Sequence, residues 1–82
     1  AMERNEVLTA LNGIFSVVLN KENLQLNEAM STDDIDNWDS LTNMTIISEI
    51  ERLWSVHFKL RDIIRMKNIG DMIDVIISRS QQ

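Results

Sequence analysis

The apolar residues of this chain recur mostly at the spacing of one face of an α-helix, and three stretches show this pattern clearly. The first predicted helix covers about residues 3–19, the second about residues 40–55 and the last about residues 69–79. A further short helix is predicted over residues 60–66, without a clear capping residue. No stretch alternates between apolar and polar positions as a strand does. The pattern predicts an all-α fold, a small four-helix bundle of three main helices and one short helix.

Trp54 and Met44 of the second predicted helix are interpreted as core residues, and they belong to a broad apolar stripe. Its members are Met44, Ile47, Ile50 and Trp54, widened by Leu41, Ile46 and Leu53. Asp39 is a good candidate N-cap, because its carboxylate can accept hydrogen bonds from unpaired first-turn amides and favours the positive end of the helix dipole. Ser40 is then the first helical residue. Asn68 followed by Asp71 resembles a similar cap for the last helix.

The helical pattern dissolves between residues 20 and 39, where Asn, Glu, Ser, Thr and Asp dominate. Single apolar residues in this stretch are expected to anchor it on the core: Leu24, Leu26, Met30 and Ile35. A long first loop of about twenty residues is unusual in so compact a domain and is more often functional than accidental. It leads the chain to Ser40, whose hydroxyl we expect to be accessible. The helix amides and dipole beside that hydroxyl would help to accommodate a phosphodiester.

Composition narrows the possible classes of protein. The 82 residues, 44% of them apolar, are enough for one globular domain but too few to enclose a large active site. With no cysteine, the chain has no thiolate nucleophile or zinc-thiolate site of its own. A net charge of −5 opposes binding to nucleic acid. The short apolar runs and the absence of a signal pattern predict a cytoplasmic protein outside the membrane, and Ala1 is interpreted as an expression remnant.

Two constellations could suggest chemistry, and we interpret both as structural. Four carboxylates gather before the second helix: Asp33, Asp34, Asp36 and Asp39. A calcium-binding EF-hand loop starting at Asp34 would need glycine at Asp39 and glutamate at Thr45, so a solvated acidic loop is the better interpretation. His57 is the single histidine and has no sequence-adjacent partner for acid-base or metal chemistry. We therefore predict no catalytic residue, no resident metal and no enzyme activity.

A wider set of residues accompanies Asp39 and Ser40. The set begins with Ile35-Asp36-Asn37-Trp38-Asp39-Ser40-Leu41 and continues with Met44, Ile47, Ile50-Glu51, Trp54, Phe58 and Asn68-Ile69-Gly70-Asp71. This set resembles the acyl carrier protein family. The resemblance runs without a gap from about Asp36 to Ile77, and the first helix and long loop match the family layout. By local pattern alone, Asp39 and Ser40 would be interpreted as a simple helix cap. The combination favours a carrier site.

The resemblance implies that Ser40 receives 4′-phosphopantetheine from coenzyme A through a phosphopantetheinyl transferase. The terminal thiol of this arm would hold acyl groups as thioesters for acyl-loading and acyl-transferring enzymes, as in fatty acid or polyketide biosynthesis. Asp39 and Leu41 match the residues that flank this serine, and Leu41 would lie under the arm. Asp39 could also help to hold the magnesium ion that accompanies the phosphate donor. We expect residues 1–82 to form one carrier domain, and we expect it to be a monomer.

Cargo and pathway stay open from the sequence. Trp38 matches a Trp-Asp-Ser-Leu version often found in discrete carriers of specialised pathways. An aminoacyl or D-alanyl carrier is an alternative, and so is a small helical interaction module without a cofactor. The chain also departs from carriers of fatty-acid synthesis, which usually present acids on and after the second helix. Thr42 and Thr45 stand at such positions, although Glu49 and Glu51 remain. If Arg52, Arg61 and Arg65 lie together on the surface beside Ser40, they should favour acidic or apolar partners.

Overall fold

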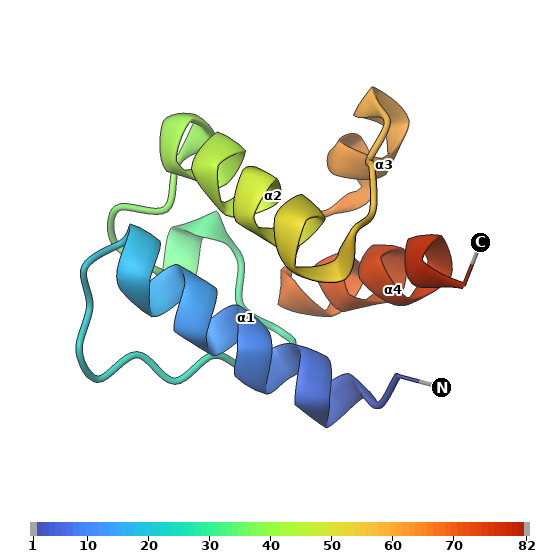
Figure 1. Cartoon of the computed structure of the whole chain (residues 1–82). Helices are drawn as coiled ribbons and strands as arrows, with labels where there is room; N and C mark the ends of the chain where they lie inside the picture. Colours follow the sequence, from blue (N-terminus) through green and yellow to red (C-terminus); the bar gives the residue numbers. More distant parts are fainter. Residues whose placement is uncertain (1, 82) are drawn as a thin grey trace.

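A computed structural model describes residues 2–81 as four α-helices without a strand, so the predicted all-α bundle is confirmed. In chain order the elements are α1 (Arg4–Val18), the short 3₁₀ helix η1 (Thr32–Asp34), α2 (Ser40–Trp54), α3 (Leu60–Arg65) and α4 (Ile69–Ser80). Each predicted helix boundary lies within one residue of its observed position. Figure 1 shows α1, α2 and α4 around a common interior, with α3 at one edge. Ala1, interpreted as a remnant, lies outside the described residues.

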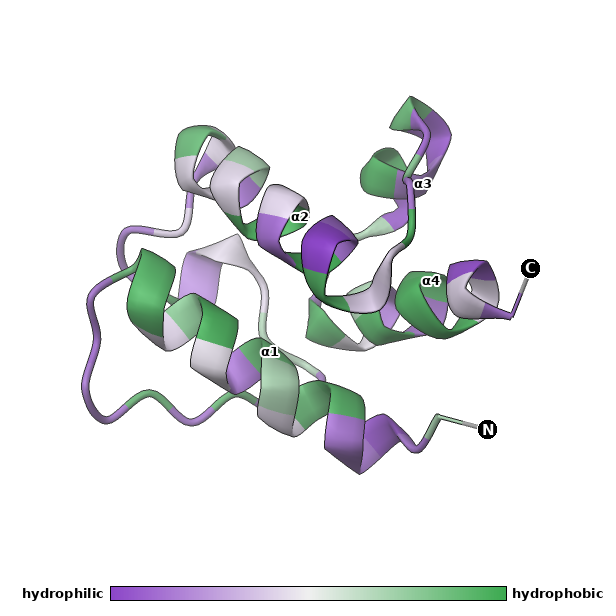
Figure 2. Cartoon of the chain, viewed as in Figure 1, coloured by the Kyte–Doolittle hydropathy of each residue, from purple (hydrophilic) through white to green (hydrophobic). Residues whose placement is uncertain are grey.

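The core is built from one face of each long helix. Figure 2 shows apolar and polar positions alternating around the helices, so that each long helix has an apolar face. The buried residues of the three long helices are Val7, Leu11 and Phe15 of α1, Ile46, Ile47 and Ile50 of α2, and Ile69, Met72, Ile73, Val75 and Ile76 of α4. Burying each large side chain contributes roughly 1.5–3 kcal/mol relative to exposure. Among residues 2–81, no helix is both long and apolar enough to cross a membrane.

The prediction that Met44 lies in the core is wrong. Leu41, Met44 and Leu53 are 78%, 57% and 56% exposed, whereas Ile46, Ile47 and Ile50 are buried. At 3.6 residues per turn, the apolar positions of α2 span more than half of the helix circumference. Neighbouring helices cover a narrower arc than that. Leu41 and Met44 therefore emerge on one side of the buried arc, and Leu53 emerges on the other.

The long first loop is held against the bundle at several points. Leu26 and Ile35 are buried, and Leu24 and Met30 pack against the core, as predicted. The amide of Asn12 in α1 brackets the loop, because Nδ2 donates to the carbonyl oxygen of Leu24 at 2.9 Å and Oδ1 accepts from the backbone N–H of Leu26 at 2.7 Å. These bonds satisfy backbone groups that an irregular segment would otherwise leave unpaired.

The same loop also closes the N-terminus of α4. Backbone N–H groups of Ile69 and Gly70 donate to the carbonyl oxygens of Met30 and Glu28, both at 2.9 Å. The Asn68 side chain accepts from the third amide, that of Asp71, at 2.8 Å, which confirms the predicted cap. Three of the four amides that a helix leaves without an internal partner are thus satisfied. This arrangement ties the loop that precedes Ser40 to the far end of the chain.

A buried carboxylate holds the six-residue helix α3 in place. Asp62 accepts from the backbone N–H of Lys59 at 2.8 Å, and so supplies the N-terminal hydrogen bond that the sequence did not suggest. Its two oxygens also accept from Nε and Nη2 of Arg79 in α4, each at 2.9 Å. Arg79 and the Lys59 amide lower the pKa of Asp62 below its usual range. A helix too short to be stable alone is therefore held by a charged, bidentate pair.

Candidate functional site

Ser40 is the first residue of α2, and its side chain is exposed. Figure 1 shows α2 beginning on the side of the molecule away from both chain ends, where the long loop arrives. The Ser40 hydroxyl makes no hydrogen bond within residues 2–81. A serine in this position combines access for another protein with a hydroxyl that no internal partner holds. The structure therefore places the predicted serine on an open helix end.

Asp39 caps α2 as predicted. Its Oδ1 accepts from the backbone N–H groups of Leu41 and Thr42, both at 3.0 Å. In turn, the Thr42 hydroxyl oxygen accepts from the Asp39 backbone N–H at 2.9 Å. The Thr42 hydroxyl also donates to the Asn37 carbonyl oxygen at 2.7 Å. The pKa of Asp39 is lowered by the Thr42 amide, then by the Thr42 hydroxyl and the Leu41 amide. The carboxylate is thus held ionised beside Ser40.

The Asp39 cap uses backbone amides at the helix N-terminus. The sequence suggested that first-turn amides would help to accommodate a phosphodiester on Ser40. Two of those amides, on Leu41 and Thr42, are already donating to the Asp39 carboxylate. A second anion close to this carboxylate would be repelled by it.

Trp38 fixes the approach to Ser40. Its ring is buried and meets Phe15 of α1 edge-on, with ring centroids 4.9 Å apart and an interplanar angle of 81°. Its indole Nε1–H donates to Asn43 Oδ1 in α2 at 3.0 Å. The preceding residue, Asn37, has a φ of 72°, a left-handed conformation that asparagine tolerates better than most residues. Trp38 therefore joins the loop, α1 and α2 directly before the site.

Apolar side chains lie next to Ser40 on the exposed surface of α2. Leu41 is 78% exposed and Met44 is 57% exposed, one and four residues after the serine. Large exposed aliphatic groups on a small protein are candidates for contact with a ligand or a partner. Leu41, predicted to lie under an attached arm, is in a position where such an arm could cover it.

The acidic loop and His57 make contacts within the fold. Asp34 accepts from the backbone N–H of Ser31 at 2.9 Å and so closes η1. No group of three or more His, Cys, Asp or Glu side chains in the described part of the chain is arranged to hold a metal ion. His57 is exposed, with Nδ1 3.4 Å from Glu51 Oε2, and the same Glu51 oxygen accepts from the Phe58 backbone N–H at 2.8 Å.

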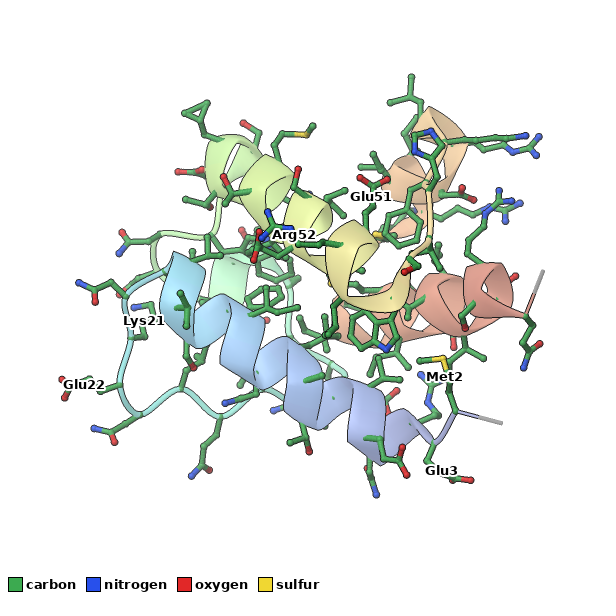
Figure 3. The ribbon with its side chains drawn as sticks, viewed as in Figure 1. Met2, Glu3, Lys21, Glu22, Glu51 and Arg52 are labelled. Carbon is green, nitrogen blue, oxygen red and sulfur yellow. The ribbon has the colours of Figure 1, made fainter. Side chains whose placement is uncertain are left out.

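The three arginines expected to form one surface beside Ser40 lie in two places. Arg61 and Arg65 line a groove between α3 and α4. Arg52 pairs with Glu49 at 2.9 Å, and Glu49 lines a different, apolar groove between α1 and α2. Figure 3 shows Arg52 on the side of α2 toward α1, away from α3. The three arginines therefore do not lie together.

Sequence reasoning missed two residues that position the site. Thr42 reciprocates the Asp39 cap, and its position three residues after the cap is where a capping box places its second member. That spacing could have indicated the role, although Glu or Gln is usual there. Asn43 accepts from the Trp38 indole, and no local pattern announces this contact.

The chain resembles a known protein in both sequence and structure. No protein-family model matches it, and no curated protein matches it. Among solved structures, it is similar to the solution NMR structure of a holo acyl carrier protein from Geobacter metallireducens. The two share 35% sequence identity with a TM-score of 0.82, over 88% of this chain and 83% of the other. This sequence identity and coverage show that the two proteins share a family as well as a fold. The chain belongs to the acyl carrier protein family.

Proposed function

We propose that the chain carries acyl groups on a 4′-phosphopantetheine arm attached to Ser40. The observation that carries the proposal is the exposed Ser40 hydroxyl, free of internal hydrogen bonds, at the start of α2. Asp39 and Trp38 hold the segment on which it stands. The similar solved protein is the holo form of an acyl carrier protein, which supports the same modification here. We further propose that residues 1–82 form one carrier domain.

The residues present fit such a group. In the modification, Ser40 Oγ would form a bond to the phosphorus of the phosphopantetheine half of coenzyme A while the pyrophosphate P–O bond breaks. The adenosine bisphosphate half would leave, and the serine proton would pass to a base of the transferase or to solvent. The terminal thiol of the arm supplies the thioester chemistry that a chain without cysteine lacks. Leu41 and Met44 offer exposed apolar surface that the arm could cover. This chain would contribute an accessible nucleophile and a rigid platform, and partner enzymes would contribute the catalysis.

Asp39 has a proposed second role beyond its cap. Its carboxylate is ionised, exposed and adjacent to Ser40. Hard oxygen ligands suit magnesium, which accompanies phosphate donors. We propose that Asp39 helps the transferase to position that ion while coenzyme A is bound. The partners of the chain would then be a phosphopantetheinyl transferase and the enzymes that load and receive its acyl cargo; monomeric state and cytoplasmic location stay predictions.

Intact mass after incubation with coenzyme A, magnesium and a broad-specificity transferase tests the proposal. Wild-type protein should gain the mass of one phosphopantetheine, and Ser40→Ala should stay folded and gain none. Ser48→Ala is the matched control, because Ser48 is another exposed serine on α2, and it should be modified like the wild type. Modification that persists in Ser40→Ala, or wild-type protein that several transferases leave unmodified, would refute the assignment.

A further inference from the structure

The segment from residue 59 to residue 67, which contains α3, presents only positive charge to solvent. Its four bases, Lys59, Arg61, Arg65 and Lys67, are all exposed. Its single acid, Asp62, is buried, with a side chain 4% exposed, and pairs with Arg79. The remainder of the chain holds 12 of the 13 acids and only 4 of the 8 bases. A basic surface therefore stands on an otherwise acidic protein.

Internal pairing does not use up this charge. The carboxylates that line the groove between α3 and α4 already have partners: Asp62 with Arg79, Asp74 with Arg4 at 2.6 Å, and Asp71 with the Lys67 backbone N–H at 3.2 Å. Arg61 and Arg65, which line the same groove, make no ion pair within residues 2–81. Their guanidinium groups, each with five donors, are open to carboxylates from outside.

The same helix also exposes large aliphatic side chains. Leu60 is 72% exposed and Ile64 is 65% exposed, one turn apart on α3. Arg61 and Arg65 follow them with the same spacing of four residues, so apolar and basic stripes run side by side along the helix. Apolar residues bordered by charged ones are the composition of a protein interface rather than of a merely solvated helix.

We propose that α3 is a docking surface for an acidic partner protein, one that presents carboxylates around an apolar contact. The proposal rests on the proposed carrier function, since the partner would be an enzyme that loads or receives the cargo. The carboxylates would bind Arg61 and Arg65, and the apolar contact would cover Leu60 and Ile64. Figure 1 shows α3 set apart from the beginning of α2, so a partner held at α3 would leave Ser40 accessible.

Charge distribution favours a protein partner over an anionic membrane. A flat anionic surface wide enough to touch α3 would also approach the acidic remainder of the molecule, which holds 12 acids against 4 bases. Such an approach is opposed by like-charge repulsion at distances of up to about 10 Å. A partner protein can instead confine its carboxylates to the surface that meets α3, and this matches the local basic patch.

Titration of the unmodified ¹⁵N-labelled protein with a helical peptide of Glu, Leu and Ala tests the proposal independently of Ser40. Amide shifts should concentrate in residues 59–67. Arg61→Glu with Arg65→Glu should weaken binding by roughly tenfold at low salt. Leu60→Ser with Ile64→Ser should weaken it severalfold, and Arg61→Gln should weaken it less than charge reversal. Lys21→Glu is the matched control; Figure 3 shows Lys21 on the opposite side of the molecule from α3, and this variant should bind like the wild type.

Other outcomes would overturn the proposal. Shifts centred outside residues 59–67, equal weakening by Lys21→Glu, or equal binding of the same peptide with Lys in place of Glu would show that α3 is not an acid-specific surface. Stronger binding to vesicles of phosphatidylglycerol and phosphatidylcholine, with the same residues shifted, would assign α3 to a membrane. Because the peptide needs no arm on Ser40, failure here leaves the carrier assignment standing, and failure of the mass experiment leaves this result standing.

Discussion

At the start of α2, the Asp39 carboxylate closes the helix through two backbone amides and stands one residue before the proposed modification site. Substitution can separate this capping role from the proposed role of Asp39 in positioning magnesium. Asparagine caps a helix about as well as aspartate but carries no charge. Asp39→Ala should lower the melting temperature by about 5 °C through loss of the cap. Asp39→Asn should melt close to the wild type.

The rate of phosphopantetheine transfer then reports on the charge of Asp39. If Asp39 helps to hold magnesium, both Asp39→Ala and Asp39→Asn should be modified more slowly than the wild type at a temperature where all three are folded. Mass spectrometry over a time course measures this. A wild-type rate for Asp39→Asn would restrict Asp39 to its structural role.

The space available for an added side chain differs between the two glycines, Gly13 and Gly70. A Cβ at Gly13, in the middle of α1, would have no neighbouring atom within 4 Å, whereas a Cβ at Gly70 would lie 3.1 Å from the Glu28 carbonyl oxygen. That oxygen accepts from the Gly70 backbone N–H, so it cannot retreat without weakening the bond. Gly13→Ala should therefore raise the free energy of unfolding by about 0.5–1 kcal/mol, since alanine favours helix. Gly70→Ala should lower it, and equal denaturation midpoints for the two variants would contradict this.

At the scale of elements, the placement of α3 depends on the buried pair between Asp62 and Arg79. The folded pKa of Asp62 lies below its unfolded value of about 4, so the pair contributes stability above that pH and loses it as the pH falls through the folded pKa. Asp62→Asn should cost about 2 kcal/mol at neutral pH, because it removes the charge opposite Arg79. Its difference from the wild type should shrink in acid.

Melting curves recorded from neutral pH down to about pH 2 measure this convergence. Asp36→Asn provides the control, since Asp36 is exposed and its side chain makes no hydrogen bond among the described residues. It should follow the wild-type curve throughout. A constant gap between Asp62→Asn and the wild type at every pH would show that the charge of Asp62 is not what holds α3.

Helix positions were predictable because each long helix has a regular apolar face, and because Asp39 and Asn68 carry a cap signal that acts within one turn. Contacts between distant segments were not predictable. Nothing local indicates that Asn12 brackets the loop, that Asp62 meets Arg79, or that Asn43 accepts from Trp38. The exposure of Met44 was missed for the same reason, since the pattern gives an apolar arc but not how much of it neighbouring helices cover.

At the scale of the whole molecule, the sign of the charge differs between the helix that begins at Ser40 and the segment around α3. Partners of fatty-acid carriers are expected to recognise acidic surfaces on and after the second helix, as the family resemblance implies. Here, residues 59–67 oppose such partners with four exposed bases, while Arg52 is already paired with Glu49. Charged surfaces govern association rate and partner discrimination more than they govern raw affinity.

The modified protein should therefore be a poor substrate for fatty-acid synthesis enzymes, because Arg61 and Arg65 repel their basic docking surfaces. Arg61→Glu with Arg65→Glu should raise the rate of acyl transfer by those enzymes severalfold, mainly at low ionic strength, since exposed charges are screened within about 10 Å at ordinary salt. Lys21→Glu makes the same charge reversal at one residue, but Lys21 lies away from α3, so this variant should leave the rate of acyl transfer unchanged. Steady-state rates of acyl transfer measured at two salt concentrations test this prediction. A wild-type protein as active as a fatty-acid carrier, with no gain from the reversal, would mean that α3 does not face these partners.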